Sequence, residues 1–126
     1  MDIASLLAQN QKHRLDDPLP SEADITNAES SLGRGLPEQY KVFLRLGGLN
    51  DLRFNHEILS PSEILHNRTY LPSLEYVPFA SNGCGDLFCW KAGELDDPQV
   101  YLWEHDSGKL LDCGANFVAW LAAQRF

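Results

Sequence analysis

Hydrophobic residues recur at helical spacing in the first half of the chain. In residues 25–49 they repeat three or four positions apart, and this spacing predicts two short helices. Gly33 and Pro37 separate them, because glycine accepts the left-handed conformation that ends a helix and proline fits the first turn of the next. Gly47 and Gly48 then end the second helix. The apolar faces of the two helices consist of Ile25, Ala28, Leu32, Tyr40, Phe43 and Leu44.

Shorter helical patterns flank this pair. A brief apolar repeat predicts an N-terminal helix over about residues 2–12, followed by a stiff connector that contains two prolines. Ser21 and Ser60 are predicted helix N-caps, and Pro61 suits the first turn of the helix that follows. A last helix is predicted over residues 115–126, with one apolar face made of Phe117, Trp120 and Leu121.

The second half of the chain changes to short apolar and aromatic runs separated by turn residues. These runs predict strands that pair as an antiparallel meander, at about residues 76–80, 87–90, 100–103 and 110–113. Pro78 cannot donate a hydrogen bond to a sheet, so it requires an edge or a bulge.

The order of these elements predicts an α+β domain. We expect an antiparallel sheet of about four to six strands, built mostly from residues 52–113, with helices packed on one face. The predicted shared core contains Tyr40, Phe43, Phe79, Phe117 and Trp120.

Composition and length fit one globular domain. The chain has 126 residues, of which 44% are hydrophobic and 22% charged. It has no apolar run of the roughly 20 residues that a membrane helix needs, and its start lacks the pattern of a signal peptide. We therefore expect a cytoplasmic protein with reduced thiols at Cys84, Cys89 and Cys113.

The charge of the chain limits its partners. Eighteen acidic and ten basic side chains give a formal net charge of −8, and no basic stretch is present to bind nucleic acid or an anionic membrane. Between Lys91 and Lys109 the charged residues are all acidic: Glu94, Asp96, Asp97, Glu104 and Asp106. This acidic segment either serves solubility alone or forms an electrostatic face for a basic protein partner.

Two groups of residues suggest chemistry, and neither predicts a site. His105 and Asp106 resemble an acid–base pair, but they open the predicted turn at residues 106–108, and adjacent residues of a strand would point to opposite faces. The cysteines with His105 could hold zinc, yet apolar residues separate Cys84 from Cys89, and no tight ligand pair stands out. We therefore predict no catalytic residue, no metal and no cofactor. Cys89 and Cys113 are predicted core residues, and surface positions are predicted for His13, His56 and His66.

An ordered series of motifs runs through most of the chain. It comprises Ile25, Glu29, Leu32, Gly33, Leu36, Pro37, Tyr40, Phe43, Leu44, Gly47 and Gly48, then residues 77–80, 83–86 and 100–101, and last Asn116, Phe117, Trp120 and Leu121. This series resembles the SUKH superfamily, which includes yeast cell-wall-synthesis regulators of the Smi/Knr type and bacterial immunity proteins. The chain departs from the pattern at Leu46, where an asparagine usually precedes the glycines.

The resemblance implies a single SUKH-like domain over residues 1–126, with residues 1–20 as N-terminal helix and connector and residues 21–126 as the core. It implies a non-enzymatic protein-binding module, in the first place a bacterial immunity protein that neutralises a cognate toxin by direct binding. The acidic charge of the chain predicts a basic toxin domain, such as a nuclease. The alternatives are a regulatory scaffold and a small hydrolase that uses His105 and Asp106. The Gly-Asp turn is a landmark of the family, so Asp86 joins the predicted partner-binding residues, which are Asp86, Glu94, Asp96, Asp97, Trp103, Glu104 and Asp106.

Overall fold

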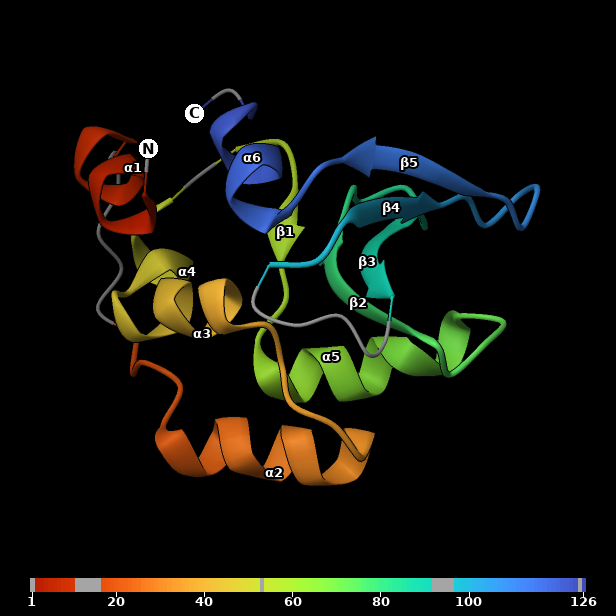
Figure 1. The fold of residues 1–126 in the computed structure, drawn as a ribbon, viewed down its shortest axis with the longest axis horizontal. Helices are drawn as coiled ribbons and strands as arrows, with labels where there is room; N and C mark the ends of the chain where they lie inside the picture. Colours follow the sequence, from red (N-terminus) through yellow and green to blue (C-terminus); the bar gives the residue numbers. More distant parts are fainter. Residues whose placement is uncertain (1, 11–16, 53, 92–96, 125) are drawn as a thin grey trace.

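Helices come first along the chain, most of the sheet follows and a helix comes last, as the sequence predicts (Figure 1). The computed structural model describes residues 2–10, 17–52, 54–91, 97–124 and 126. The helices of these ranges are α1 (Ile3–Asn10), α2 (Glu22–Leu32), α3 (Glu38–Arg45), α4 (Gly48–Asp51), α5 (Pro61–Asn67), the 3₁₀ turn η1 (Arg68–Tyr70) and α6 (Phe117–Ala122). The strands are β1 (Glu57–Ile58), β2 (Tyr76–Ser81), β3 (Leu87–Lys91), β4 (Val100–Trp103) and β5 (Leu110–Gly114).

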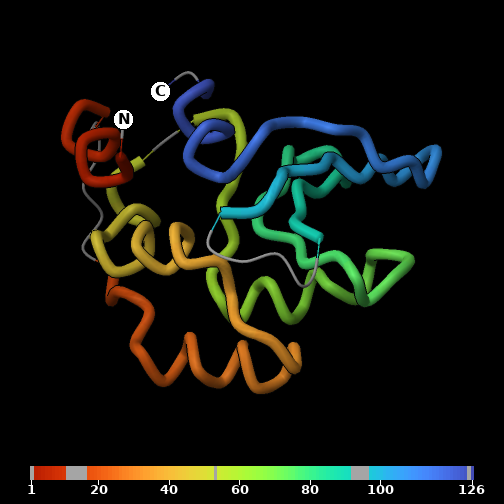
Figure 2. The backbone as a smooth tube through the Cα atoms, in the orientation of Figure 1, coloured from red at the N-terminus to blue at the C-terminus, as the bar shows by residue number. Residues whose placement is uncertain are grey.

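The five strands form one antiparallel sheet in the order of the chain, β1-β2-β3-β4-β5. Figure 2 shows consecutive strands following one another as a meander through the second half of the chain. The register between β2 and β3 shifts between Pro78 and Ala80, which is the bulge that a proline inside a strand requires. The predicted α+β fold with an antiparallel sheet is therefore confirmed.

Side-chain caps fix where the helices begin. Ser21 accepts the N–H of Asp24 at 3.1 Å, and the Asp24 carboxylate accepts the N–H of Ser21 at 2.8 Å. Ser60 and Glu63 form the same reciprocal pair at the start of α5. Because each pair satisfies two backbone donors that a helix start leaves open, both predicted starts are confirmed.

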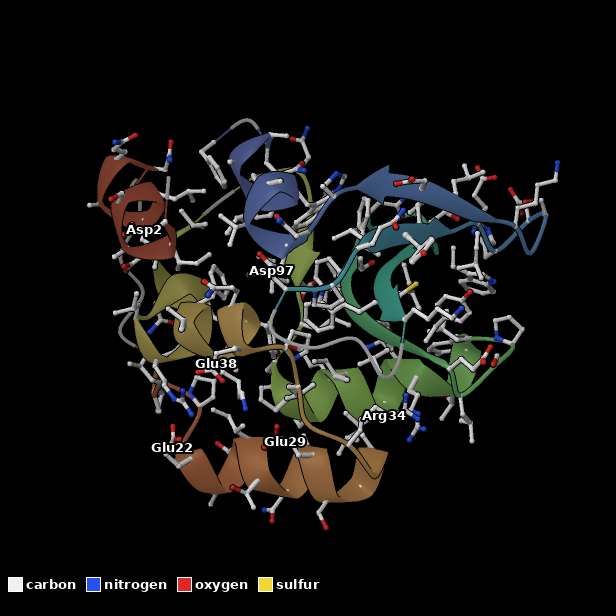
Figure 3. All side chains as sticks on the ribbon, in the orientation of Figure 1. Asp2, Glu22, Glu29, Arg34, Glu38 and Asp97 are labelled. Carbon is white, nitrogen blue, oxygen red and sulfur yellow. The ribbon has the colours of Figure 1, made fainter. Side chains whose placement is uncertain are left out.

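Glu29 joins α2 to α3. One of its carboxylate oxygens accepts the N–H of Leu36 at 2.7 Å and lies 3.3 Å from the ammonium of Lys41. Figure 3 shows Glu29 on α2, on the side that faces α3. Gly33 ends α2 at φ 73°, a left-handed conformation. This family residue therefore positions the loop between the helices and is part of the scaffold.

The predicted aromatic core forms as expected. Tyr40, Phe43, Phe79 and Phe117 are fully buried, and Trp120 is 3% exposed. Trp90 stacks on Phe79 with ring centroids 4.3 Å apart, and the Tyr40 hydroxyl donates to the carbonyl of Leu59 at 2.6 Å.

Alternate residues of β3 divide the sheet into two faces. Phe88 and Trp90 belong to the large core that the helices cover, whereas Leu87 and Cys89 form a smaller cluster with Leu71. The side of this smaller cluster is called the outer face here. It is completed by side chains that stay partly exposed, namely Tyr76, Tyr101, Trp103 and Leu110.

Two sequence-based placements differ from the structure. Cys113 is exposed, because it lies on β5 at the edge of the sheet, where three of the five residues face solvent. His56 is half-buried, and its ring centroid lies 4.8 Å from that of Phe88 and 6.2 Å from that of Trp120. Polar neighbours in the sequence hid this aromatic packing. The predicted C-terminal helix also proves shorter, and a one-turn helix, α4, follows Gly47.

Candidate protein-binding surface

The turns after β2 and after β4 are tied together at one end of the sheet. Oδ1 of Asp86 accepts the backbone N–H of His105 at 3.1 Å and lies 2.6 Å from the ring Nδ1 of that residue. Oδ2 of Asp86 accepts the side-chain amide of Asn82 at 3.0 Å. Gly85 allows this contact, because a Cβ there would lie 2.9 Å from Nδ1 of His105. The Gly-Asp turn is therefore shaped to hold His105.

His105 lies between two carboxylates. Its Nδ1 contacts Asp86, and its Nε2 lies 3.1 Å from Oδ1 of Asp106. The hydrogen bond to Asp86 raises the pKa of His105, and the same bond lowers the pKa of Asp86. His105 and Asp106 occupy the predicted turn, and the additional expectation that their side chains point apart, as in a strand, is wrong because the two side chains are in contact.

Trp103 and Glu104 continue this region from the last residue of β4. Trp103 lies on the outer face, opposite Leu87 on one side and Leu110 on the other. Its indole Nε1 is buried and has no hydrogen-bond partner among the described residues. Glu104 is half-exposed and accepts the hydroxyl of Ser107 at 3.3 Å.

We name these residues the turn-end surface: Asp86, Trp103, Glu104, His105 and Asp106. The Asp106 side chain is 92% exposed, whereas that of Asp86 is 20% exposed. Among the described residues, the structure thus gathers four of the sequence-predicted partner-binding residues, and they surround a histidine that the sequence did not assign to the surface.

Asp97 lies elsewhere. It precedes β4, whereas Glu104 follows that strand, so the whole of β4 separates the two residues. The carboxylate of Asp97 accepts the N–H of Phe117 at 2.7 Å at the start of α6, and burial raises its pKa. Figure 3 shows Asp97 beside α6. The remaining two predicted residues, Glu94 and Asp96, lie outside the described residues.

The three cysteines occupy different environments. Cys89 is buried in the sheet, and burial raises its pKa to about 12, while Cys84 and Cys113 are exposed; all three are free thiols. In the part of the chain that the structure describes, no group of three or more His, Cys, Asp or Glu side chains is placed to hold a metal ion. None of the helices in that part is both long enough and apolar enough to cross a bilayer.

Comparisons with known proteins agree with the fold. The sequence profile described as the SMI1 / KNR4 family (SUKH-1) matches residues 19–123. A crystal structure of a protein from Pseudomonas syringae pv. tomato is similar, with a TM-score of 0.59 and 20% sequence identity over 82% of this chain and 81% of the other. At that identity the likeness shows the fold alone. No curated protein matches the chain.

Proposed function

Because the chain belongs to the SMI1 / KNR4 family (SUKH-1), we propose that it is a non-enzymatic protein-binding module, and specifically an immunity protein that neutralises a cognate toxin by direct binding. The single observation that carries the binding role is the turn-end surface, where exposed carboxylates stand beside a partly exposed tryptophan. The partner is a basic protein domain, since the chain has a formal net charge of −8.

Each residue of the turn-end surface has a distinct part in this proposal. Asp106 and Glu104 offer negative charge to solvent, whereas Asp86 is occupied by Asn82 and His105 and shapes the turn. Trp103 supplies apolar area, and tryptophan is enriched among residues that dominate binding energy at interfaces.

A nuclease domain is one class of basic toxin that this surface fits. A nuclease must present a basic face to hold phosphates. An acidic protein that covers that face competes with the nucleic acid. Complementary charge speeds association, and salt weakens that effect because the screening length is about 10 Å at 0.1 M.

The geometry of His105 supports binding over hydrolysis. A general base needs a free ring nitrogen within hydrogen-bond reach of the proton that it removes. Both ring nitrogens of His105 contact carboxylates, one from Asp86 and one from Asp106. The raised pKa of His105 favours the protonated ring, which cannot accept a proton.

The test uses the protein that is encoded by the gene next to this one. We expect it to be toxic when expressed alone and harmless when this chain is co-expressed. The double substitution Glu104→Gln and Asp106→Asn keeps shape and removes charge, so it should slow association at low salt and have little effect at high salt. Trp103→Ala should instead raise the dissociation rate.

The matched control for charge is the double substitution Asp51→Asn and Glu75→Gln, which removes the same charge away from the turn-end surface. Equal slowing by the control would refute the turn-end surface as the binding site. A neighbouring protein that neither harms cells nor binds this chain would overturn the immunity proposal itself.

A further inference from the structure

A groove of about 850 Å³ lies among α2, α4, β1 and α5, which can be located in Figure 1. Its apolar lining includes Leu19, Leu49, Leu52, Phe54, Ile58 and Leu65. The volume falls in the range of about 300–1,000 Å³ that is typical of ligand sites. The residues of the groove are separate from those of the turn-end surface, so what it binds is a question beyond the proposed function.

The charged residues along the described lining of this groove are all acidic. Four carboxylates contribute: Asp17, Asp24, Glu57 and Glu63. Asp24 and Glu63 also cap helices through Ser21 and Ser60. The side chains of Asp17 and Glu57 form no hydrogen bond or ion pair with any described residue. We refer to this region as the acidic groove.

The acidic groove also borders an edge of the sheet. β1 is the first strand in the sheet order, and it pairs with β2 on one side. Both of its residues, Glu57 and Ile58, line the groove. An extended peptide can bind by adding to such an edge while its alternate side chains enter apolar pockets. Leu19, which is 47% exposed, adds apolar surface at the groove.

We propose that the acidic groove binds an extended segment of a protein partner in which lysine or arginine alternates with apolar residues. The apolar side chains cover the floor of the groove, and the cationic ones pair with Asp17 and Glu57. Charge complementarity selects this occupant, because an acidic or neutral segment would leave both carboxylates without a partner. His56, also in the lining, adds no positive charge when neutral, and its pKa is lowered by burial.

The test is selection of a phage-displayed library of random short peptides on the whole protein. We expect the enriched peptides to carry lysine or arginine next to leucine, isoleucine, valine or phenylalanine. One enriched peptide is then labelled, and its affinity is measured by fluorescence anisotropy. The double substitution Asp17→Asn and Glu57→Gln should weaken it about tenfold at low salt, as the loss of two surface ion pairs implies. Leu19→Ser should also weaken it.

The matched control is the double substitution Glu104→Gln and Asp106→Asn, which removes equal charge at the turn-end surface and should leave the peptide affinity unchanged. Enrichment of acidic or uncharged peptides would refute the proposal, as would a library that yields no binder. Equal weakening by the control would show that net charge, and not the acidic groove, governs binding. The toxin experiment measures binding of a different protein and varies Trp103, Glu104 and Asp106, so failure of the peptide experiment leaves its outcome unaffected.

Discussion

The turn-end surface and the acidic groove both present carboxylates, but they use them differently. At the turn end, Asp86 is bound by Asn82 and His105, and Asp106 contacts the same histidine. In the groove, Asp17 and Glu57 have side chains with no bonded partner in the described part of the chain. Both regions therefore use part of their charge for their own structure, but only the groove has carboxylates, those of Asp17 and Glu57, that form no hydrogen bond or ion pair with any described residue.

This difference shows that a cluster of acidic residues in the sequence does not indicate which carboxylates are free to bind a partner. The acidic segment between Lys91 and Lys109 contains Asp97, yet the carboxylate of Asp97 is used at the start of α6. The groove carboxylates are spread over residues 17–63 and meet only in the folded chain. Local sequence density therefore identified one acidic region and missed the other.

The largest expected effect comes from the aromatic residue at each region. Phe43 lines the groove and is fully buried, whereas Trp103 is half-buried at the turn end. Phe43→Ala should lower the free energy of unfolding by about 3–5 kcal/mol, because it opens a cavity in the core. Trp103→Ala should lower the free energy of unfolding by less, because water can fill part of the space that the indole ring leaves. Urea denaturation measures the loss of unfolding free energy in both variants. An equal loss would contradict the difference in burial between Phe43 and Trp103.

The glycines of the two regions give a second, smaller contrast. A Cβ at Gly48 would lie 2.2 Å from the Cε2 atom of Phe43, so Gly48→Ala forces a buried ring to move and should cost about 1–3 kcal/mol. Gly85→Ala would strain the backbone at φ 99° by about 1–2 kcal/mol, and its Cβ would meet the half-exposed ring of His105, which can shift more easily than a buried ring. Thermal unfolding should therefore rank Gly48→Ala as the more damaging change.

The scaffold was largely predictable from local patterns. Helical spacing identified the buried positions of α2 and α3, and Ser21 and Ser60 marked helix starts because capping depends on residues only three positions apart. Pro78 indicated a bulge from its missing donor alone. Each of these features depends on residues that are close together in the sequence, so it can be predicted without knowing the fold.

The sites depended on contacts between distant residues. Asp86 and His105 are 19 positions apart, and nothing local indicates that their turns meet. His56 has polar neighbours in the sequence but packs against Phe88 and Trp120. The position of β5 at the sheet edge exposes Cys113, which the sequence placed in the core. Such placements follow from strand order and helix packing, which local patterns do not encode.

Neutralising one carboxylate in each region tests the central comparison directly. Asp86→Asn should lower the melting temperature, because it weakens the charged bonds to His105 and leaves the amide of Asn82 poorly paired. Glu57→Gln should leave the melting temperature nearly unchanged, since this side chain has no partner among the described residues. Differential scanning calorimetry at neutral pH measures both variants. A larger loss at Glu57 would show that the groove carboxylate also has a structural role.

The smallest expected effects are pH dependences of opposite sign at the two histidines. The pKa of His105 is raised by Asp86, so its contribution to stability is complete below the unfolded value of about 6.5 and is lost as the pH rises through the folded pKa. The pKa of His56, which lines the groove, is lowered by burial. As the pH falls below about 6.5, the unfolded chain takes up this proton first, so the contribution of His56 to stability decreases.

Removing each titration separates the two contributions. Melting temperatures of His105→Asn should approach those of the wild type as the pH rises, because the wild type then loses the advantage of the charged pair. The difference in melting temperature between His56→Asn and the wild type should instead shrink as the pH falls, because protonation of His56 destabilises only the wild-type fold. Ring-proton NMR titrations of the wild type assign the two pKa directions independently. If the pKa values of both histidines lie on the same side of the unfolded value of about 6.5, then Asp86 and burial do not shift the two histidines in opposite directions.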